Sequence, residues 1–281
     1  MKKVFALALT VLMVMSMFAG CGSSNTTKTT TEAPAATAAE TTAAATTAAE
    51  TAAAELKTVE SGKLIMSTNA AFPPYEMVAD DGSFEGIDVE VAGAIAEKLG
   101  LELVVDDMDF DAALLAVQQN KSDIVMAGVT VTDERQKVMD FSDTYAEGIQ
   151  SIIVPEDSDI ASADDLTGKA IGTQRGTTGY IYCTDDFGED NVIAYDDGLT
   201  AVQALNNGQV DAVVIDNAPA QEFVAANPGL KILDTAYAQE DYAIGVAKGN
   251  TQLLDAINGA LEELQDDGTL QAIVDKYITA E

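Results

Sequence analysis

The stretch LELVVDDMDFDAALLAVQQNKSDIVMAG, Leu101 to Gly128, contains the alternation on which the fold depends. Its two apolar runs, LELVV and DIVMAG, flank the segment AALLAVQQN, whose apolar residues recur with a helical period. A strand, a helix and a strand in this order predict parallel strands joined by a covering helix. The pattern begins further upstream, where the run KLIMST precedes the helical segment VEVAGAIAEKLG, with Asp88 as its expected N-cap.

A second copy of this alternation follows toward the C-terminus. The runs IQSIIV, KAIGT, NVIAY and DAVVID predict strands, and helices are expected from Thr178, from Leu199 to Asn207 and over PAQEFVAAN. The chain closes with the runs LKIL and YAIGVA and with two helical segments around TQLLDAINGALEELQ and TLQAIVDKYI. We therefore expect an α/β protein of two halves, whose terminal segments pack back onto the first half.

The charge of the chain excludes several classes of partner. Its 281 residues carry 14 Lys and Arg against 47 Asp and Glu, a net charge of −33. Such a surface repels nucleic acid and anionic membranes, so neither is expected to bind it directly. The chain also has no histidine, which removes the usual general base and the commonest metal ligand. We expect no metal, no cofactor and no enzymatic activity.

The first twenty residues, MKKVFALALTVLMVMSMFAG, are typical of an export signal: two lysines, an apolar run and small residues. The end of this signal, Phe18-Ala19-Gly20-Cys21, resembles a bacterial lipobox, in which the cysteine becomes lipidated and anchors the protein to the membrane. The alternative is a signal peptide cleaved near Ala19 that leaves Cys21 as a free thiol. With Cys21 lipidated only Cys183 remains, so no intramolecular disulfide is possible, and Cys183 is expected to be inert.

Residues 21–58 are predicted to form a disordered tether. They consist almost entirely of Ser, Thr, Ala and Glu. A segment with so little apolar surface cannot offset the entropy lost on ordering. The folded part of the chain is therefore expected to begin near residue 59.

The candidate binding residues follow the predicted strands. In open α/β sheets, ligands bind beyond the carboxyl ends of the strands, and with two such halves the natural position is the cleft between them. The residues at these positions are Asn69, Phe72, Asp109, Phe110, Asp111, Gly128, Thr130, Arg135, Arg175, Gly176, Thr177, Thr178 and Asp216.

The chain has two arginines, Arg135 and Arg175, and Arg135 follows the strand DIVMAG within the stretch MAGVTVTDERQ. A guanidinium can hold a carboxylate through two parallel charge-assisted hydrogen bonds, which lysine cannot do. Thr130 and backbone N–H groups near Gly128 could complete the carboxylate shell. A short helix starting at Thr132 would carry Arg135 and add its dipole.

The opposite pole of the predicted ligand would be an ammonium group. Asp216 follows the apolar run AVVI, where an unpaired charge is costly, so an incoming ammonium is a suitable partner. Phe72 and Phe110 could enclose the apolar stem between the two poles. The set of residues therefore favours a zwitterion that carries a carboxylate and an ammonium.

Each arginine also has a structural interpretation. Arg135 could form a surface salt bridge with Asp133, Glu134 or Asp140, which are close in sequence. Arg175 is followed by a glycine that favours a turn, which could point this side chain outward.

The remaining candidates have structural alternatives as well. Asp216 could simply cap the helix over PAQEFV, and Thr177 or Thr178 could cap the helix that follows GTQRG. Phe72 lies beside two prolines and could be a core anchor instead of a ligand platform.

Six strings in the sequence resemble the extracytoplasmic amino-acid-binding proteins of ABC importers, in the polar amino acid family. They are TNAAFPPYE, FEGIDVEVAGAIAEKLG, MDFDAAL, DIVMAGVTVTDERQKVMDFSDTY, GKAIGTQRGTTG and NGQVDAVVIDNAPA, and the resemblance in order and spacing covers about Lys63 to Tyr277. The resemblance implies a type II periplasmic binding protein, with two Rossmann-like lobes and a two-strand hinge. Such a protein closes over a free L-amino acid and docks on a transmembrane permease.

The resemblance also implies a set of ligand-binding residues. Arg135 would bind the α-carboxylate, Asp216 would accept the α-ammonium, and the whole set would be Asn69, Phe72, Phe110, Gly128, Thr130, Arg135, Thr177, Thr178 and Asp216. Asn69 falls where many relatives have an acidic residue, and a neutral side chain there weakens the expectation of a cationic amino acid. Arg175 and Asp111 remain open as further contacts to the ligand side chain.

The implied boundaries are residues 59–146 plus 243–281 for lobe 1 and residues 147–242 for lobe 2. The hinge strands would lie near Tyr145–Ile149 and Ala238–Tyr242. The protein is expected to act as a monomer, held at the cell membrane through Cys21. Two alternatives share the fold: an exported enzyme of the dehydratase type, and a lipoprotein that senses a ligand instead of delivering it.

Overall fold

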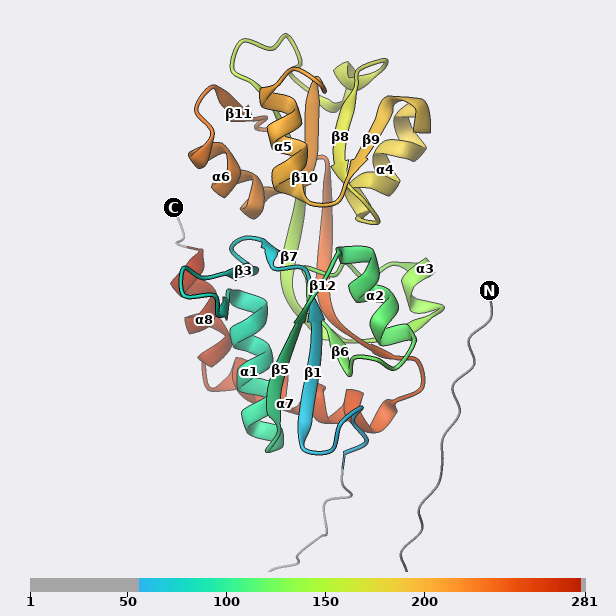
Figure 1. The fold of residues 1–281 in the computed structure, drawn as a ribbon, viewed down its shortest axis with the longest axis vertical. Helices are drawn as coiled ribbons and strands as arrows, with labels where there is room; N and C mark the ends of the chain where they lie inside the picture. The colour runs from blue at the N-terminus through green and yellow to red at the C-terminus, as the bar shows by residue number, and fades with distance from the viewer. Residues whose placement is uncertain (1–55, 279–281) are drawn as a thin grey trace, which may run out of the picture. The chain divides into compact units, whose positions relative to one another are not determined.

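The computed structural model describes residues 56–278, so the sequence predictions for residues 1–55, including the signal peptide, Cys21 and most of the tether, lie outside the described part. The described chain is built on a nine-stranded sheet with the order β5-β1-β6-β12-β7-β10-β8-β9, and β11 pairs with β7. Helices cover this sheet in two groups of elements, called lobe 1 and lobe 2, joined by β7 and β12 (Figure 1).

Lobe 1 contains the parallel strands predicted around Leu101 to Gly128. Strand β1 pairs in parallel with both β5 and β6, which confirms the strand-helix-strand interpretation. Its elements are β1 (Lys63–Thr68), α1 (Ile87–Leu99), β5 (Glu102–Asp107), α2 (Phe110–Gln118), β6 (Ile124–Val125), α3 (Asp133–Gln136), α7 (Thr251–Asp266) and α8 (Thr269–Tyr277).

Lobe 2 repeats the alternation, as expected from the sequence. Strand β8 pairs in parallel with both β9 and β10, and helices flank them. Its elements are the 3-10 helices η1 (Ala163–Leu166) and η2 (Glu189–Asn191), β8 (Ile171–Gln174), α4 (Thr178–Phe187), β9 (Val192–Tyr195), α5 (Gly198–Asn206), β10 (Ala212–Asp216), α6 (Asn217–Ala226) and β11 (Leu230–Ile232).

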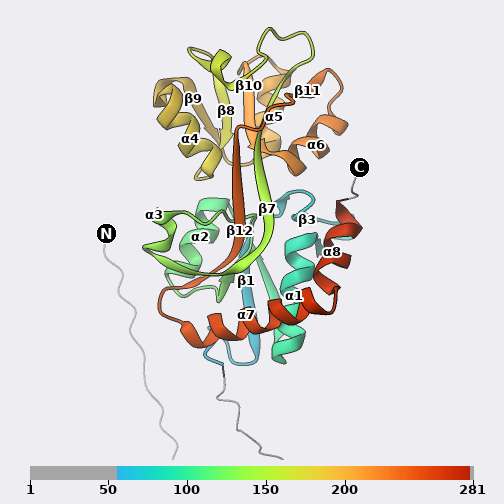
Figure 2. The same ribbon diagram turned by 180° about the vertical axis from the view of Figure 1, so that it is seen from behind.

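Two long antiparallel strands connect the lobes. Strands β7 (Met139–Pro155) and β12 (Ala238–Ala247) lie side by side between the two groups of elements (Figures 1 and 2). At one end β12 pairs with β6 of lobe 1, and at the other β7 pairs with β10 of lobe 2. The expected runs IQSIIV and YAIGVA are therefore parts of longer strands, which we call the hinge strands.

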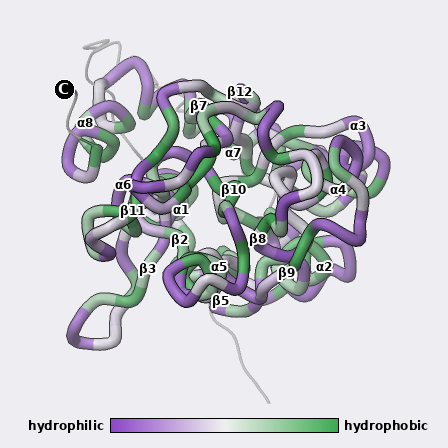
Figure 3. The backbone as a smooth tube through the Cα atoms, turned by 90° about the horizontal axis from the view of Figure 1, so that it is seen from above, coloured by the Kyte–Doolittle hydropathy of each residue, from purple (hydrophilic) through white to green (hydrophobic). Residues whose placement is uncertain are grey.

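The C-terminal helices return to lobe 1, as predicted. Helix α7 packs against α1, α8 packs against both, and Lys98 of α1 pairs with Glu263 of α7 at 3.1 Å. Lys276 of α8 forms an ion pair with Glu90 of α1. Along the tube in Figure 3, hydrophilic stretches are prominent in the peripheral loops, while several sheet strands are coloured hydrophobic. Within residues 56–278 no helix combines the length and apolar character needed to cross a bilayer.

Two local features differ from the sequence predictions. Gly86, not Asp88, is the N-cap of α1, because Asp88 lies inside the first turn and is fully buried. A small antiparallel sheet of β2 (Ala71–Phe72), β3 (Glu76–Val78) and β4 (Phe84–Glu85) was not predicted, since its strands are too short to show a period. Cys183 is buried, and burial raises the pKa of its thiol to about 12, which agrees with an inert role.

Candidate ligand-binding cleft

A narrow pocket lies between the lobes, and about 10 Å³ of it is open to a water-sized molecule. All nine predicted ligand-binding residues line it, although they come from separate parts of the chain. Three further residues complete the lining: Glu76, Ala127 and Gln174. The fold therefore brings the predicted set together, and contact with a ligand stays a prediction.

Arg135 is buried in this pocket and forms no surface salt bridge with Asp133, Glu134 or Asp140. It lies in α3, whose N-cap Thr132 accepts a hydrogen bond from the Arg135 backbone N–H. Its guanidinium donates to the Thr130 carbonyl at 2.8 Å and, across the cleft, to the Gly176 carbonyl at 3.2 Å. It also lies over the Phe110 ring, 5.4 Å from the centroid. Burial lowers the pKa of the guanidinium, and nearby carboxylates partly offset this.

Asp216 faces Arg135 from lobe 2. It occupies the N-cap position of α6 but makes no capping hydrogen bond with its side chain. Instead its carboxylate accepts hydrogen bonds from the Tyr242 hydroxyl and, at 2.7 Å, from Gln150 Nε2. Burial raises the pKa of Asp216 to about 7, and these hydrogen bonds only partly counteract it.

Glu76 is the feature of the pocket that the sequence did not reveal. Its side chain is fully buried in β3, and its carboxyl group lies against that of Asp88, with no N–H donor among the described residues within hydrogen-bond reach. Burial raises its pKa well above the usual range, and the negative charge of Asp88 adds to the shift. Nearby, Gln174 donates to Asn69 Oδ1 at 2.8 Å, which joins the two walls directly.

Buried carboxylates outnumber cations around the cleft. Asp88 accepts hydrogen bonds from the Gly128 backbone N–H at 2.9 Å and the Tyr145 hydroxyl at 2.8 Å, and burial raises its pKa to about 6. Glu240 of β12 is also buried. Glu76 and Asp216 line the pocket with Arg135, the one cation among its described lining residues, and Asp88 and Glu240 are hydrogen-bonded to the lining residues Gly128 and Thr130. Burial thus shifts Glu76, Asp88 and Asp216 toward their neutral forms, and a cation that enters the cleft would favour their ionised forms.

The rim of the cleft resolves the remaining candidates. Arg175 points outward, with half of its side chain exposed, and pairs with Asp196 at 3.3 Å. Thr177 caps α4 by accepting a hydrogen bond from the Tyr180 backbone N–H, and Thr177 also lines the pocket. Thr178 Oγ1 lies 3.5 Å from Thr130 Oγ1 in the other lobe. The capping and binding interpretations of the Thr177 segment are thus compatible.

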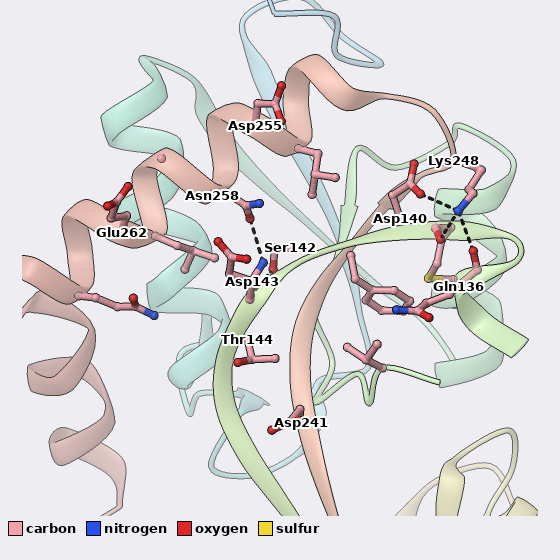
Figure 4. Close-up of a pocket in the computed structure, with 17 residues that line it drawn as sticks. Gln136, Asp140, Ser142, Asp143, Thr144, Asp241, Lys248, Asp255, Asn258 and Glu262 are labelled. Carbon is pink, nitrogen blue, oxygen red and sulfur yellow. Dashed lines mark hydrogen bonds and ion pairs between the residues drawn. The ribbon is translucent and has the colours of Figure 1, made fainter. Parts of the chain in front are cut away.

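A wider hollow, with a volume of about 1300 Å³, lies outside the cleft between α7 and the hinge strands (Figure 4). Several carboxylates line it, and Lys248 pairs with one of them, Asp140, at 2.6 Å. Its lining includes neither arginine of the chain. Among the described residues, no group of three or more His, Cys, Asp or Glu side chains is arranged to hold a metal ion.

Comparison with known proteins agrees with this geometry. A family model for bacterial extracellular solute-binding proteins, family 3, matches residues 64–280. The L-cystine-binding protein TcyJ of Escherichia coli K12 is 34% identical over 228 residues, 80% of this chain and 86% of that protein. The arginine-binding extracellular protein ArtP of Bacillus subtilis is 34% identical over 236 residues, 79% of this chain and 89% of that protein.

A solved structure supports the fold independently. An ancestral arginine-binding protein bound to glutamine is 42% identical, with a TM-score of 0.75, and the match covers 79% of this chain and all of that one. The chain therefore belongs to the bacterial extracellular solute-binding proteins of family 3, and it binds a polar amino acid outside the cytoplasm for an ABC transporter.

Proposed function

We propose that this protein holds the two poles of an L-amino acid between Arg135 and Asp216. The supporting observation is that a buried guanidinium from lobe 1 and a buried carboxylate from lobe 2 line one pocket. The guanidinium binds the α-carboxylate, and the carboxylate accepts the α-ammonium. Because the ligand contacts both lobes, it favours the closed form by its higher affinity for that form.

The α-carboxylate of the ligand would replace the hydrogen bond that Arg135 makes to the Gly176 carbonyl. Arg135 Nη2 donates to the Gly176 carbonyl at 3.2 Å, a bond between neutral and charged groups. A ligand carboxylate offers two charged acceptors to the same fork, which forms shorter and stronger hydrogen bonds. Asn69, Phe72, Phe110, Gly128, Thr130, Thr177 and Thr178 complete the enclosure around this exchange.

The proposed ligand is L-arginine. The Glu76 carboxyl group is buried in the pocket beside that of Asp88 and meets no N–H donor among the described residues, so its ionised form is costly unless a donor or cation reaches it. A guanidinium supplies both a positive charge and a fork of N–H donors. This outweighs the neutral Asn69, whose amide is already bonded to Gln174. The matched relatives named for arginine support the choice.

Calorimetry with L-arginine, L-glutamine and L-glutamate tests the ligand class. The wild type is expected to prefer arginine, since glutamine offers donors without charge and glutamate repels the buried acids. Glu76→Gln removes the acid that would ionise beside a bound guanidinium, with little change of shape. It should weaken arginine binding by at least about tenfold and glutamine binding much less. Equal losses for both ligands, or tight binding of glutamate, would contradict the proposed ligand.

We also propose that Cys21 carries a lipid anchor, that the protein is a monomer and that it acts by binding without catalysis. The lobes are assigned to residues 59–146 plus 243–281 and residues 147–242, with delivery to a transmembrane permease. Labelling with a radioactive fatty acid should mark the wild type and not Cys21→Ser. Arginine recovered from the purified complex should be chemically unchanged.

A further inference from the structure

The hinge strands present polar side chains to the cleft. Because side chains alternate along a strand, Glu240 and Tyr242 of β12 share the inward face, whereas Asp241 between them is exposed. On β7, Gln150 is likewise buried. None of these hinge residues is among the predicted ligand-binding set.

These side chains form one continuous chain of hydrogen bonds. Glu240 Oε2 accepts from Thr130 Oγ1 at 3.1 Å and from Gln150 Nε2 at 2.9 Å. The same Gln150 nitrogen donates to Asp216 Oδ2 at 2.7 Å, and the Tyr242 hydroxyl donates to the other Asp216 oxygen. Thr130 of lobe 1 and Asp216 of lobe 2 are thereby connected through Glu240 and the hinge.

The network does not simply stabilise the fold. Glu240 Oε1 is buried without a hydrogen bond of ordinary geometry among the described residues, and the nearby Tyr182 hydroxyl, whose pKa is raised by burial and then by Glu240, is its neighbour. A buried carboxylate that is only half satisfied costs free energy, so an apolar or amide side chain would serve stability better. The position of this charge therefore points to a role in the cleft.

The direction of one hydrogen bond explains that role. The Thr130 hydroxyl donates to Glu240 Oε2, so its proton points toward that carboxyl group. The lone pairs of Thr130 Oγ1 then face the Thr178 hydroxyl, 3.5 Å away, and a donor that enters the cleft. A hydroxyl oriented in this way can accept a hydrogen bond from an ammonium group. Thr130 can then donate to a carboxylate only through its backbone N–H.

We propose that Glu240 is a positioning residue for the ligand's α-ammonium. Glu240 accepts a hydrogen bond from the Thr130 hydroxyl and positions Asp216 through Gln150. Thr130 Oγ1 and the Asp216 carboxylate then both direct lone pairs at the same cation. This inference rests on the proposed binding of the amino acid between Arg135 and Asp216, and it concerns only the ammonium pole.

The test is calorimetry of Glu240→Gln with L-arginine and with L-glutamine, which share the α-ammonium. A glutamine at this position can donate to Thr130 and reverse its polarity. Both affinities should fall by similar factors, at least about tenfold. The unfolding midpoint of the ligand-free variant should not fall, because the half-satisfied carboxylate is gone. The matched control is Asp241→Asn, which removes the same charge from the adjacent exposed position, beside the outer hollow (Figure 4), and should leave both affinities unchanged.

A double-mutant cycle separates positioning from general damage. Thr130→Val removes the hydroxyl at similar volume, so Glu240→Gln should cost less in this background than in the wild type. Fully additive losses, a loss below about twofold, or an equal loss in Asp241→Asn would overturn the proposal. If Arg135→Ala and Asp216→Ala both keep their affinity, the binding site itself is misplaced. If they lose it while Glu240→Gln does not, only the role of Glu240 fails.

Discussion

Individual side chains around the cleft combine a single cation with an excess of acids. Arg135 is surrounded by buried carboxylates but is hydrogen-bonded to carbonyl oxygens and not to any of them. Its charge thus remains available to an incoming carboxylate. Asp216 is held by Tyr242 and Gln150, neither of which neutralises it. The two poles are fixed in place before a ligand arrives, which reduces the entropy cost of binding.

Replacement of Arg135 should separate charge from geometry. Arg135→Ala is expected to weaken arginine binding by at least about a hundredfold, because both charge-assisted hydrogen bonds to the carboxylate are lost. Arg135→Lys keeps the charge without the planar fork and should fall in between. Calorimetry measures both affinities, and circular dichroism checks that the variants fold. An alanine variant with wild-type affinity would rule out the proposed carboxylate site.

Replacement of Asp216 should show opposite effects on binding and stability. Its pKa is raised from the ordinary 3.8 to about 7. The folded protein therefore binds the extra proton between these values, and stability from this group is present below the lower value and lost as the pH rises through the upper one. Asp216→Asn should abolish tight arginine binding and yet stabilise the ligand-free protein at about pH 8 by ~1–3 kcal/mol.

Urea denaturation at two pH values measures this stability difference. The gain from Asp216→Asn should shrink toward about pH 4, where the wild-type carboxyl is protonated in the folded state. A variant that is less stable than the wild type at high pH would mean that the ionised carboxylate is well solvated. In that case the carboxylate would not need an ammonium partner.

The sequence revealed the residues that follow strands and missed those that lie within them. Asp216 stands out because it ends an apolar run, and Arg135 because it is one of two arginines and follows such a run within seven residues. Glu76 and Glu240 lie in or beside short polar stretches, and only the tertiary structure turns them into the cleft. Asp88 was misinterpreted as a helix cap because local spacing fits a cap, while its partner Gly128 is forty positions away.

Among the elements, the hinge strands carry a tight contact that links packing to the site. A Cβ added to Gly148 of β7 would lie 2.4 Å from the ring of Tyr242 on β12. Tyr242 is fully buried and donates to Asp216, so it cannot move without disturbing the ammonium site. The alternation of strands and helices was predictable from apolar periods. The length of β7 was not, because its polar stretch around Asp143 reads as a loop.

Gly148→Ala should therefore affect both stability and binding. Overpacking against Tyr242 is expected to cost about 1–3 kcal/mol of unfolding free energy and to weaken arginine binding. Chemical denaturation and calorimetry measure the two effects. The control is Gly259→Ala in α7, where an added Cβ meets nothing within 4 Å. It should stabilise the protein by about 0.5–1 kcal/mol and leave affinity unchanged. A neutral Gly148→Ala would mean that the hinge contact is loose.

At the scale of the whole folded unit, the two lobes are connected by hydrogen bonds across the cleft as well as by the hinge strands. Gln174 reaches Asn69, and Arg135 reaches the Gly176 carbonyl across the cleft. The two-lobed arrangement followed from the sequence because both halves repeat one pattern. These cross-cleft bonds could not be predicted, since they depend on how the lobes meet. In the proposed mechanism, a ligand that exchanges with them would link occupancy to closure, and closure would present both lobes together to the permease.

The most direct test of this account is a crystal structure of the protein with L-arginine. It should show the α-carboxylate hydrogen-bonded to both terminal nitrogens of Arg135 and the α-ammonium against Asp216 and Thr130 Oγ1. The ligand guanidinium should meet the Glu76 carboxylate. An arginine bound in the reverse direction, or bound outside the cleft with Arg135 still donating to the Gly176 carbonyl, would contradict it.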